Sequence, residues 1–342
     1  MKRESNLDLL RVFCCVAVIL EHVCGVFLNE VKNAGGGYLC IVATMSYFAI
    51  PCFLMLTGAF LSARIENVRE FYKKSLVKLG IPTLIFTVLY SAWYISLSAI
   101  NGNLHKGLIN VLRYYKTGWS GHPLWYMYML VGLYAILPIV FKAITEVKIN
   151  ILILSSVFCI WAVISSYTST ISVTYNLCRV VLMLSYVVAG YAIKKTVQNK
   201  NNRNGVLLIT SGIVFLIING LLVYHDLLLD LNWRNWANNF SPFVMAGSLL
   251  IFAGFCKIEF TKQIRFTNYT FIIYLFHKGV LEVIQVFVGK LLPVSHEMPY
   301  IVSLIFIEVV VVFIISLLFS VIYTKVMSVF QTKKNYSQNE HH

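Results

Sequence analysis

Two histidines and one arginine carry the strongest chemical signal in this sequence, because each lies inside a long apolar segment. An ionisable side chain in a membrane helix is disfavoured by roughly 2.5–3.5 kcal/mol, so one that is kept there is a functional candidate. Arg11 and His22 are eleven residues apart, which is close to three helical turns, and Asp8 precedes Arg11 by three residues. On one helix these three side chains therefore share a stripe.

The chemistry of this stripe follows from the residue types. Arg11, near the start of its segment, suits an anionic ligand, whereas His22 lies about 16 Å further along the helix axis. Imidazole is the side chain whose ordinary pKa lies nearest neutrality, so His22 could exchange protons with a substrate. His277 sits about ten residues into a later apolar segment and is expected at a similar depth. The alternative is structural: Asp8 pairs with Arg11, and His22 bonds a neighbouring helix.

The elements that hold these residues are predicted to be membrane helices. Of the 342 residues, 58% are hydrophobic and 12% are charged, whereas a soluble domain has about a quarter charged residues. This excludes a soluble enzyme. We predict an all-α polytopic membrane protein with one domain over residues 1–330 and a short polar tail over 331–342. About ten segments are long enough to cross a bilayer: 7–29, 38–62, 77–100, 122–141, 149–168, 175–193, 205–224, 240–256, 267–290 and 299–324.

The net charge of +14 predicts orientation and gives no reason to expect a nucleic acid. If both termini are cytoplasmic, only six of the 28 basic residues fall on the opposite side, and three lie within spans. The other nineteen are cytoplasmic, which is the bias of the positive-inside rule. The six are Lys32, Lys106, Arg113, Lys116, Arg234 and Lys290. The eight cysteines lack metal-ligand spacing, so no metal site is expected.

Five blocks of sequence resemble, in order, the bacterial integral-membrane acyltransferase family 3. The first is Asn-Leu-Asp-Leu-Leu-Arg at 6–11, followed after ten residues by His22. The other four blocks are residues 47–58 ending Thr-Gly, the basic run 71–82, His-Pro-Leu-Trp-Tyr at 122–126 and Tyr-Leu-Phe-His at 274–277. Three details depart from the family pattern. Thr57 stands where the family usually has Ser, Tyr126 stands where Phe is usual, and the basic run uses Lys where Arg is common.

The resemblance implies an enzyme of the bacterial inner membrane that transfers an acyl group, with acetyl preferred, from acyl-CoA to a hydroxyl of a cell-surface or lipid-linked glycan. Acyl-CoA is a co-substrate, and no permanently bound cofactor is expected. The expected partners are the bilayer, acyl-CoA and the acceptor. We assign His22 as the general base and expect two further catalytic residues, His277 and Tyr274. The residues expected to bind the donor are Arg11, Asp8, Lys73, Lys74 and Lys78, and those expected to bind the acceptor are His122, Trp125, Tyr126 and Trp119.

Two other functions stay open at this point. A transporter of a polyprenyl-linked saccharide would also line a pathway with buried charges, although the sequence shows no inverted repeat. A sensor domain without turnover is the third possibility. Aromatic residues in the segments 101–121 and 225–239 suit either a sugar platform or an interfacial aromatic belt.

Overall fold

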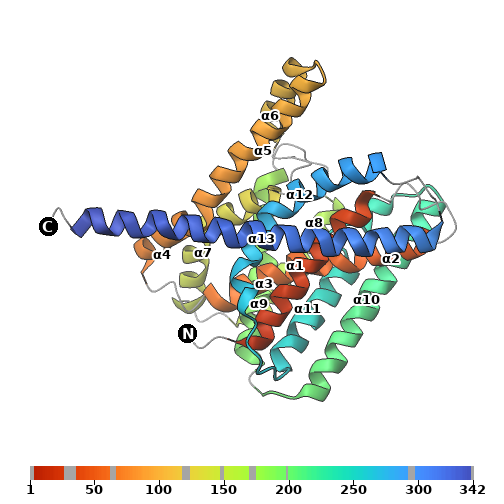
Figure 1. Cartoon of the computed structure of the whole chain (residues 1–342). Helices are drawn as coiled ribbons and strands as arrows, with labels where there is room; N and C mark the ends of the chain where they lie inside the picture. The colour runs from red at the N-terminus through yellow and green to blue at the C-terminus, as the bar shows by residue number, and fades with distance from the viewer. Residues whose placement is uncertain are drawn as a thin grey trace.

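The computed structural model describes residues 4–26, 36–61, 67–117, 124–146, 150–168, 175–197, 199–291 and 297–339, and in them all regular structure is helical (Figure 1). The α-helices are α1 (Ser5–Val26), α2 (Gly36–Met45), α3 (Ala49–Leu61), α4 (Val68–Ser75), α5 (Ile81–Ile100), α6 (Leu104–Thr117), α7 (Trp125–Glu146), α8 (Ile151–Thr168), α9 (Tyr175–Thr196), α10 (Asn202–Leu228), α11 (Pro242–Lys257), α12 (Thr270–Leu291) and α13 (Met298–Asn339).

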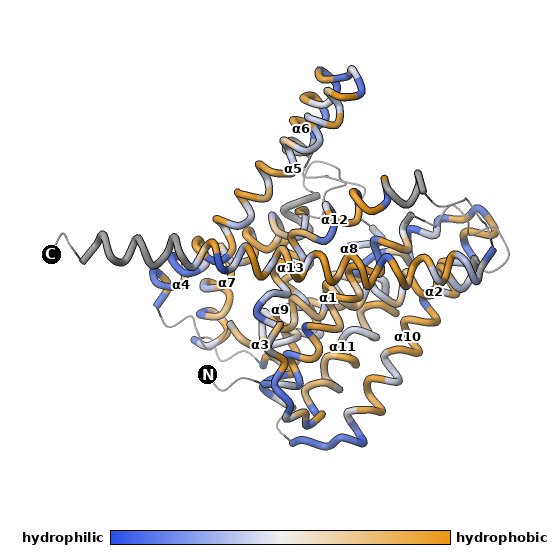
Figure 2. The backbone as a smooth tube through the Cα atoms, viewed as in Figure 1, coloured by the Kyte–Doolittle hydropathy of each residue, from blue (hydrophilic) through white to orange (hydrophobic). Residues whose placement is uncertain are grey.

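These helices make the chain a multi-pass membrane protein. Each of the ten predicted segments overlaps a helix or a pair of continuous helices. Among the described residues, five helical stretches are long and apolar enough to cross a bilayer: 37–60, 68–100, 125–146, 202–228 and 299–328. Figure 2 shows the hydrophobic stretches along these helices. The all-α class is therefore confirmed, while the number ten and the orientation of the termini stay predictions.

Glycines allow two pairs of helices to pack unusually closely. A methyl group added at Gly58 of α3 would overlap the carbonyl of Val187 in α9, and one at Gly190 of α9 would overlap the carbonyl of Met55. Helices α10 and α11 meet in the same way through two reciprocal glycine contacts. Small residues at such crossings let helix backbones approach in a membrane, where close van der Waals packing drives association. The reciprocal pairs are Gly205 with Gly254 and Gly212 with Gly247.

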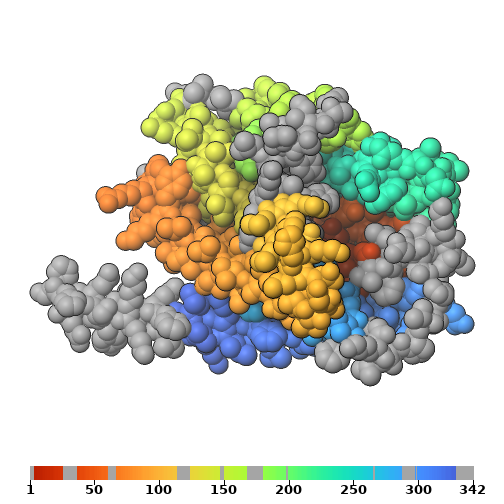
Figure 3. Space-filling view, turned by 90° about the horizontal axis from the view of Figure 1, so that it is seen from above, coloured from red at the N-terminus to blue at the C-terminus, as the bar shows by residue number. Residues whose placement is uncertain are grey.

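Helices α4 and α5 form one long rod that changes its winding in the middle. Residues Leu76–Gly80 are π-helical, and the Ile81 N–H donates to the carbonyl of Leu76. Pro82 follows directly, and because proline has no N–H it cannot donate the α-helical bond to the carbonyl four residues before it. This rod then turns back into α6, and the α5–α6 hairpin projects from the bundle in Figure 1, so that in Figure 3, seen from above, it lies in front of the other helices. The segment 101–121, which links two of the predicted spans, thus contains the fourteen-residue helix α6.

Helix α1 lies at the centre of the packing and positions the site. It contacts α2, α3, α11, α12 and α13. The Sγ atom of Cys15 in α1 lies 4.0 Å from the carbonyl oxygen of Thr270 in α12. A second contact, between the rings of His22 and His277, lies seven residues further along both helices. Helices α1 and α12 therefore run parallel and in register, so the two histidines face each other at one level.

Candidate active site

The rings of His22 and His277 stack on each other, with centroids 5.2 Å apart and planes inclined by 27°. His277 is fully buried, whereas His22 is partly accessible. The pair joins α1 and α12, which are 255 residues apart in the chain. The accessible ring can reach a substrate, and the buried ring packs behind it.

The hydrogen bond of His277 defines its tautomer. Its Nδ1 lies 2.5 Å from the carbonyl oxygen of Tyr274, and a carbonyl oxygen can only accept. Nδ1 therefore carries the proton, and in the neutral ring Nε2 has a lone pair. This buried Nε2 finds no hydrogen-bond partner among the described residues. Since buried polar atoms are normally paired, an orphaned ring nitrogen beside a second histidine marks a place where a substrate group could bind.

Two tyrosines extend the histidine pair into an aromatic cluster. The ring of Tyr274 lies 5.3 Å from His277 and 5.2 Å from Tyr126, which in turn lies 6.1 Å from Trp125. Tyr126 is buried at the start of α7, so this end of α7 reaches the level of the histidine pair. Of the two residues that we assigned to the acceptor, Tyr126 thus contacts Tyr274 directly, and Trp125 packs against Tyr126. His122 and Trp119 fall outside the described residues.

Arg11 lies on the same helix as His22, three turns nearer the N-terminus. Its Nη1 donates to the Asp8 carboxylate over 2.8 Å, and its guanidinium lies 5.6 Å from the centre of the Phe60 ring. Asp8 is buried, whereas the Arg11 side chain is 29% exposed. This arrangement fits either a structural ion pair or a cation held ready for an anionic ligand. A guanidinium has five N–H donors and keeps its charge when paired, so the bond to Asp8 is compatible with both.

The three lysines of the predicted donor site lie on the exposed side of the α4–α5 rod. Lys73, Lys74 and Lys78 are all exposed, and Lys74 pairs with Glu70 of the same helix at 2.5 Å. The Tyr72 hydroxyl donates to the carbonyl of Ala135 in α7 over 2.7 Å, which fixes α4 against α7. The structure thus places Arg11 in the bundle and the lysines on its surface.

Sequence reasoning missed a set of polar contacts between α5 and α12. The Tyr90 hydroxyl donates to the carbonyl of Leu275 over 2.9 Å and accepts from the Gly279 N–H over 3.0 Å. These two residues flank His277 in α12. Glu282 accepts from Trp93 Nε1 over 3.2 Å and from the Tyr94 hydroxyl over 2.6 Å. The available signal was the spacing of these three aromatic residues at i, i+3 and i+4, which places them on one helix face.

The fold and the site together describe a polytopic membrane protein with a histidine pair at its centre. The chain matches the acyltransferase domain of acyltransferase family 3 over residues 4–325. The chain belongs to this family, which confirms the resemblance seen in its motifs, and it is therefore a membrane acyltransferase.

The chain is also similar to part of an amino-acid racemase from Enterococcus faecalis. The identity is 30% over 139 residues, which cover 37% of this chain and 18% of the racemase. The chain thus spans a small part of that relative's length. No solved structure matches the chain.

Proposed function

We propose that the protein transfers an acyl group, preferably acetyl, from acyl-CoA to a hydroxyl of a cell-surface or lipid-linked glycan at the bacterial inner membrane. The observation that carries this proposal is the stacked histidine pair, with the accessible ring of His22 next to the orphaned Nε2 of His277. Family membership supports acyl transfer over transport.

The reaction assigns a task to each group of the site. The acceptor oxygen attacks the thioester carbonyl, and His22 takes the hydroxyl proton as the new C–O bond forms. The C–S bond of the tetrahedral intermediate then breaks, and the thiolate of CoA leaves and takes the proton from His22, which returns to the neutral imidazole. A base positioned in this way contributes about 10²–10⁴ in rate, and oxyanion donors contribute about 10²–10³. We assign the oxyanion role to Tyr274, because its ring contacts His277.

The donor enters from the end of α1 that carries Arg11. CoA bears several negative charges, and a guanidinium recognises phosphate with a planar set of donors. Because Arg11 lies about 16 Å along the helix from His22, a CoA held there can extend its thioester towards the histidines. Asp8 orients Arg11, and the exposed lysines Lys73, Lys74 and Lys78 attract the polyanion from solution.

The test is a transfer assay with protein reconstituted in liposomes, radiolabelled acetyl-CoA and a lipid-linked glycan. Wild-type protein should label the glycan, and His22→Gln should reduce the turnover by about 10²–10⁴ because Gln keeps a hydrogen-bonding group but cannot act as a base. His105→Gln, at an exposed histidine of α6, is the matched control and should keep wild-type turnover.

The transfer assay also decides which of the two histidines, His22 or His277, acts as the base. If His22→Gln keeps most of the turnover with the acceptor saturated, His22 is not the base, and His277→Gln becomes the deciding variant. Mass spectrometry of surface glycans from cells with and without the gene gives the second readout. An acyl-sized mass difference supports the proposal, and loss of the whole polymer contradicts it.

A further inference from the structure

Lys278 follows His277 directly in α12 and lies at the level of the histidine pair. Its ammonium group is close enough to the rings of His22 and His277 to interact electrostatically with both. Lys278 is partly accessible, as His22 is, whereas His277 is buried. A lysine inside a membrane helix is disfavoured by roughly 2.5–3.5 kcal/mol, so a lysine kept at this depth is a functional candidate.

The rotation of the two helices places Lys278 on the side of the histidine pair that α13 does not cover. Successive residues of an α-helix are about 100° apart, and α1 and α12 run parallel with His22 facing His277. The residue after His22 and the residue before His277 therefore point to one side. These residues are Val23 and Phe276, and both pack with α13. Lys278, on the other side of His277, points away from α13.

The carboxylate nearest to Lys278 along α12 is occupied by other donors. Glu282 is one helical turn further along, a spacing at which opposite charges on a helix interact. Its two oxygens instead accept from Trp93 Nε1 over 3.2 Å and from the Tyr94 hydroxyl over 2.6 Å, both in α5. Within the described residues, Glu282 and Lys278 form no ion pair.

Glu21 is the other charged side chain at this level. It precedes His22 in α1, and its carboxylate interacts electrostatically with Tyr47 and Tyr274. In the part of the chain that the structure describes, no ion pair joins Glu21 to Lys278 either. The positive charge of Lys278 is therefore free to act on a group bound beside the histidines.

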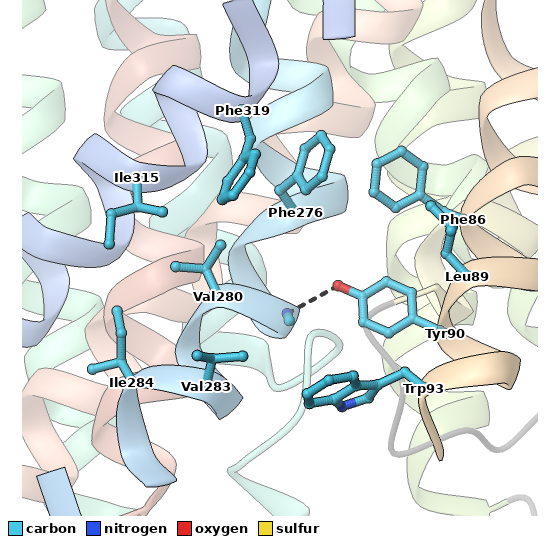
Figure 4. Close-up of a pocket in the computed structure, with 11 residues that line it drawn as sticks. Phe86, Leu89, Tyr90, Trp93, Phe276, Val280, Val283, Ile284, Ile315 and Phe319 are labelled. Atoms are coloured by element: carbon cyan, nitrogen blue, oxygen red, sulfur yellow. Dashed lines mark hydrogen bonds between the residues drawn. The ribbon is translucent and has the colours of Figure 1, made fainter. Parts of the chain in front are cut away.

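Tyr90 of α5 holds the turn that carries Lys278. Its hydroxyl donates to the carbonyl of Leu275 over 2.9 Å and accepts from the Gly279 N–H over 3.0 Å, the contact that Figure 4 draws as a dashed line. These two backbone groups enclose His277 and Lys278 in one turn. Tyr90 also lines an apolar groove of about 370 Å³ between α5, α12 and α13, and Lys278 does not line it. The backbone of Lys278 is thus fixed together with that of His277.

The proposed reaction develops negative charge where this ammonium group acts. When the acceptor hydroxyl attacks the thioester, the carbonyl oxygen becomes an oxyanion and the proton goes to His22. The oxyanion and the attacking oxygen belong to one tetrahedral carbon, so a cation that acts on His22 is also near the oxyanion. A donor aimed at such an oxygen contributes about 10²–10³ in rate, and a full charge acts more strongly at low dielectric than in water.

We propose that Lys278 is a catalytic residue whose ammonium group donates a hydrogen bond to the carbonyl oxygen of the bound thioester and stabilises the oxyanion that forms there. This inference rests on the proposed function and adds a charged donor to the neutral hydroxyl of Tyr274. Lys278 transfers no proton. The oxyanion collapses to the ester carbonyl as the C–S bond breaks, and His22 gives its proton to the departing thiolate.

The first test is the transfer assay with variants of Lys278. Lys278→Met keeps the length of the side chain without its charge and should reduce kcat by about 10²–10³ at unchanged KM for acetyl-CoA and acceptor, because the lost interaction belongs to the transition state. Lys278→Arg should keep more activity, since the charge remains. Lys278→Gln replaces the first variant if Lys278→Met does not fold. Lys142→Met, at an exposed lysine of α7, is the matched control and should keep wild-type kcat.

The kinetic constants distinguish this role from two others. A raised KM for the acceptor at unchanged kcat would make Lys278 a binding residue for an anionic group of the acceptor. Wild-type kinetics in Lys278→Met would leave the ammonium group without a part in the reaction. Either result overturns the inference.

A second measurement needs no turnover. A cation at the carbonyl oxygen weakens the C=O bond and lowers its stretching frequency, which infrared difference spectra of bound acetyl-CoA, labelled with carbon-13 at the thioester carbonyl, can detect. Wild-type protein should lower this frequency relative to free acetyl-CoA, and Lys278→Met should lose most of the shift. An unshifted carbonyl in the wild-type protein contradicts the inference.

The two measurements separate this inference from the proposed function. A carbonyl shift that is lost in Lys278→Met, in a protein that acylates no glycan, defeats the proposed function and supports the inference. Transfer to a glycan by wild-type protein with an unshifted carbonyl does the reverse.

Discussion

Two halves of this bundle are built on different packing principles. The helix pairs α3–α9 and α10–α11 approach so closely that glycines are required at their crossings. Around α5, α12 and α13 the contacts are made by large aromatic side chains, which leave a groove of about 370 Å³ between the helices. Close backbone packing gives a rigid frame, and aromatic packing leaves space between helices. The histidine pair lies where α1 brings these two halves together.

The largest expected stability effect is in the closely packed half. Gly190→Ala places a methyl group against the carbonyl of Met55, so α3 and α9 must separate, and we expect a loss of about 3 kcal/mol as for overpacked cores. Thermal unfolding in detergent should show a clear drop in Tm. Gly25→Ala is the control, because a Cβ atom there meets nothing within 4 Å. Equal Tm values for the two variants would mean that α3 and α9 are not tightly packed.

The next largest expected effect is on CoA binding at the end of α1 that carries Arg11. Arg11→Ala should weaken CoA binding by roughly ten- to a hundredfold, since a charge-assisted hydrogen bond contributes about 1.5–3 kcal/mol. Arg11→Lys should weaken it less, because the charge remains. Isothermal titration with CoA measures both, and Arg234→Ala, on the segment 225–239, is the control. Wild-type affinity in Arg11→Ala would leave the ion pair with Asp8 as the role of this residue.

A smaller effect is expected where the groove meets the site. Tyr90→Phe removes two hydrogen bonds to the turn that carries His277, each worth about 0.5–1.5 kcal/mol. We expect kcat to fall about tenfold while the affinity for CoA stays unchanged. The control is Tyr128→Phe in α7, which removes a hydroxyl that bonds Thr87 on the exposed side of α5. This variant should keep kcat within twofold of wild type. Equal kcat values in the two variants would show that Tyr90 does not position His277.

The last prediction concerns how both halves are oriented in the membrane, and no change in activity is expected. Single cysteines at positions 105 and 230, on a cysteine-depleted background, should react with an impermeant maleimide added from outside, and one at position 200 should not. The reason is the nineteen-to-six distribution of basic residues outside the spans. The reverse labelling pattern would also move the donor entrance to the outer face.

The sequence by itself determined the class of the protein and the separation of Arg11 and His22 along their helix. Apolar segments of about 20 residues are sufficient to predict membrane helices, because a helix in lipid must satisfy its own backbone hydrogen bonds. The spacing from Arg11 to His22 followed from helix geometry alone. The ordered motifs gave the family, which the comparison over residues 4–325 confirmed.

Only the tertiary structure decided which residues share the site. The stacking of His22 on His277 and the closure of the groove by Phe86, Phe276 and Phe319 depend on how distant helices pack. A helical periodicity shows which residues lie on one face, and it does not show which helix covers that face. That choice is made by contacts such as the glycine crossings of α3 with α9, whose partners are far apart in the chain and leave no local signal.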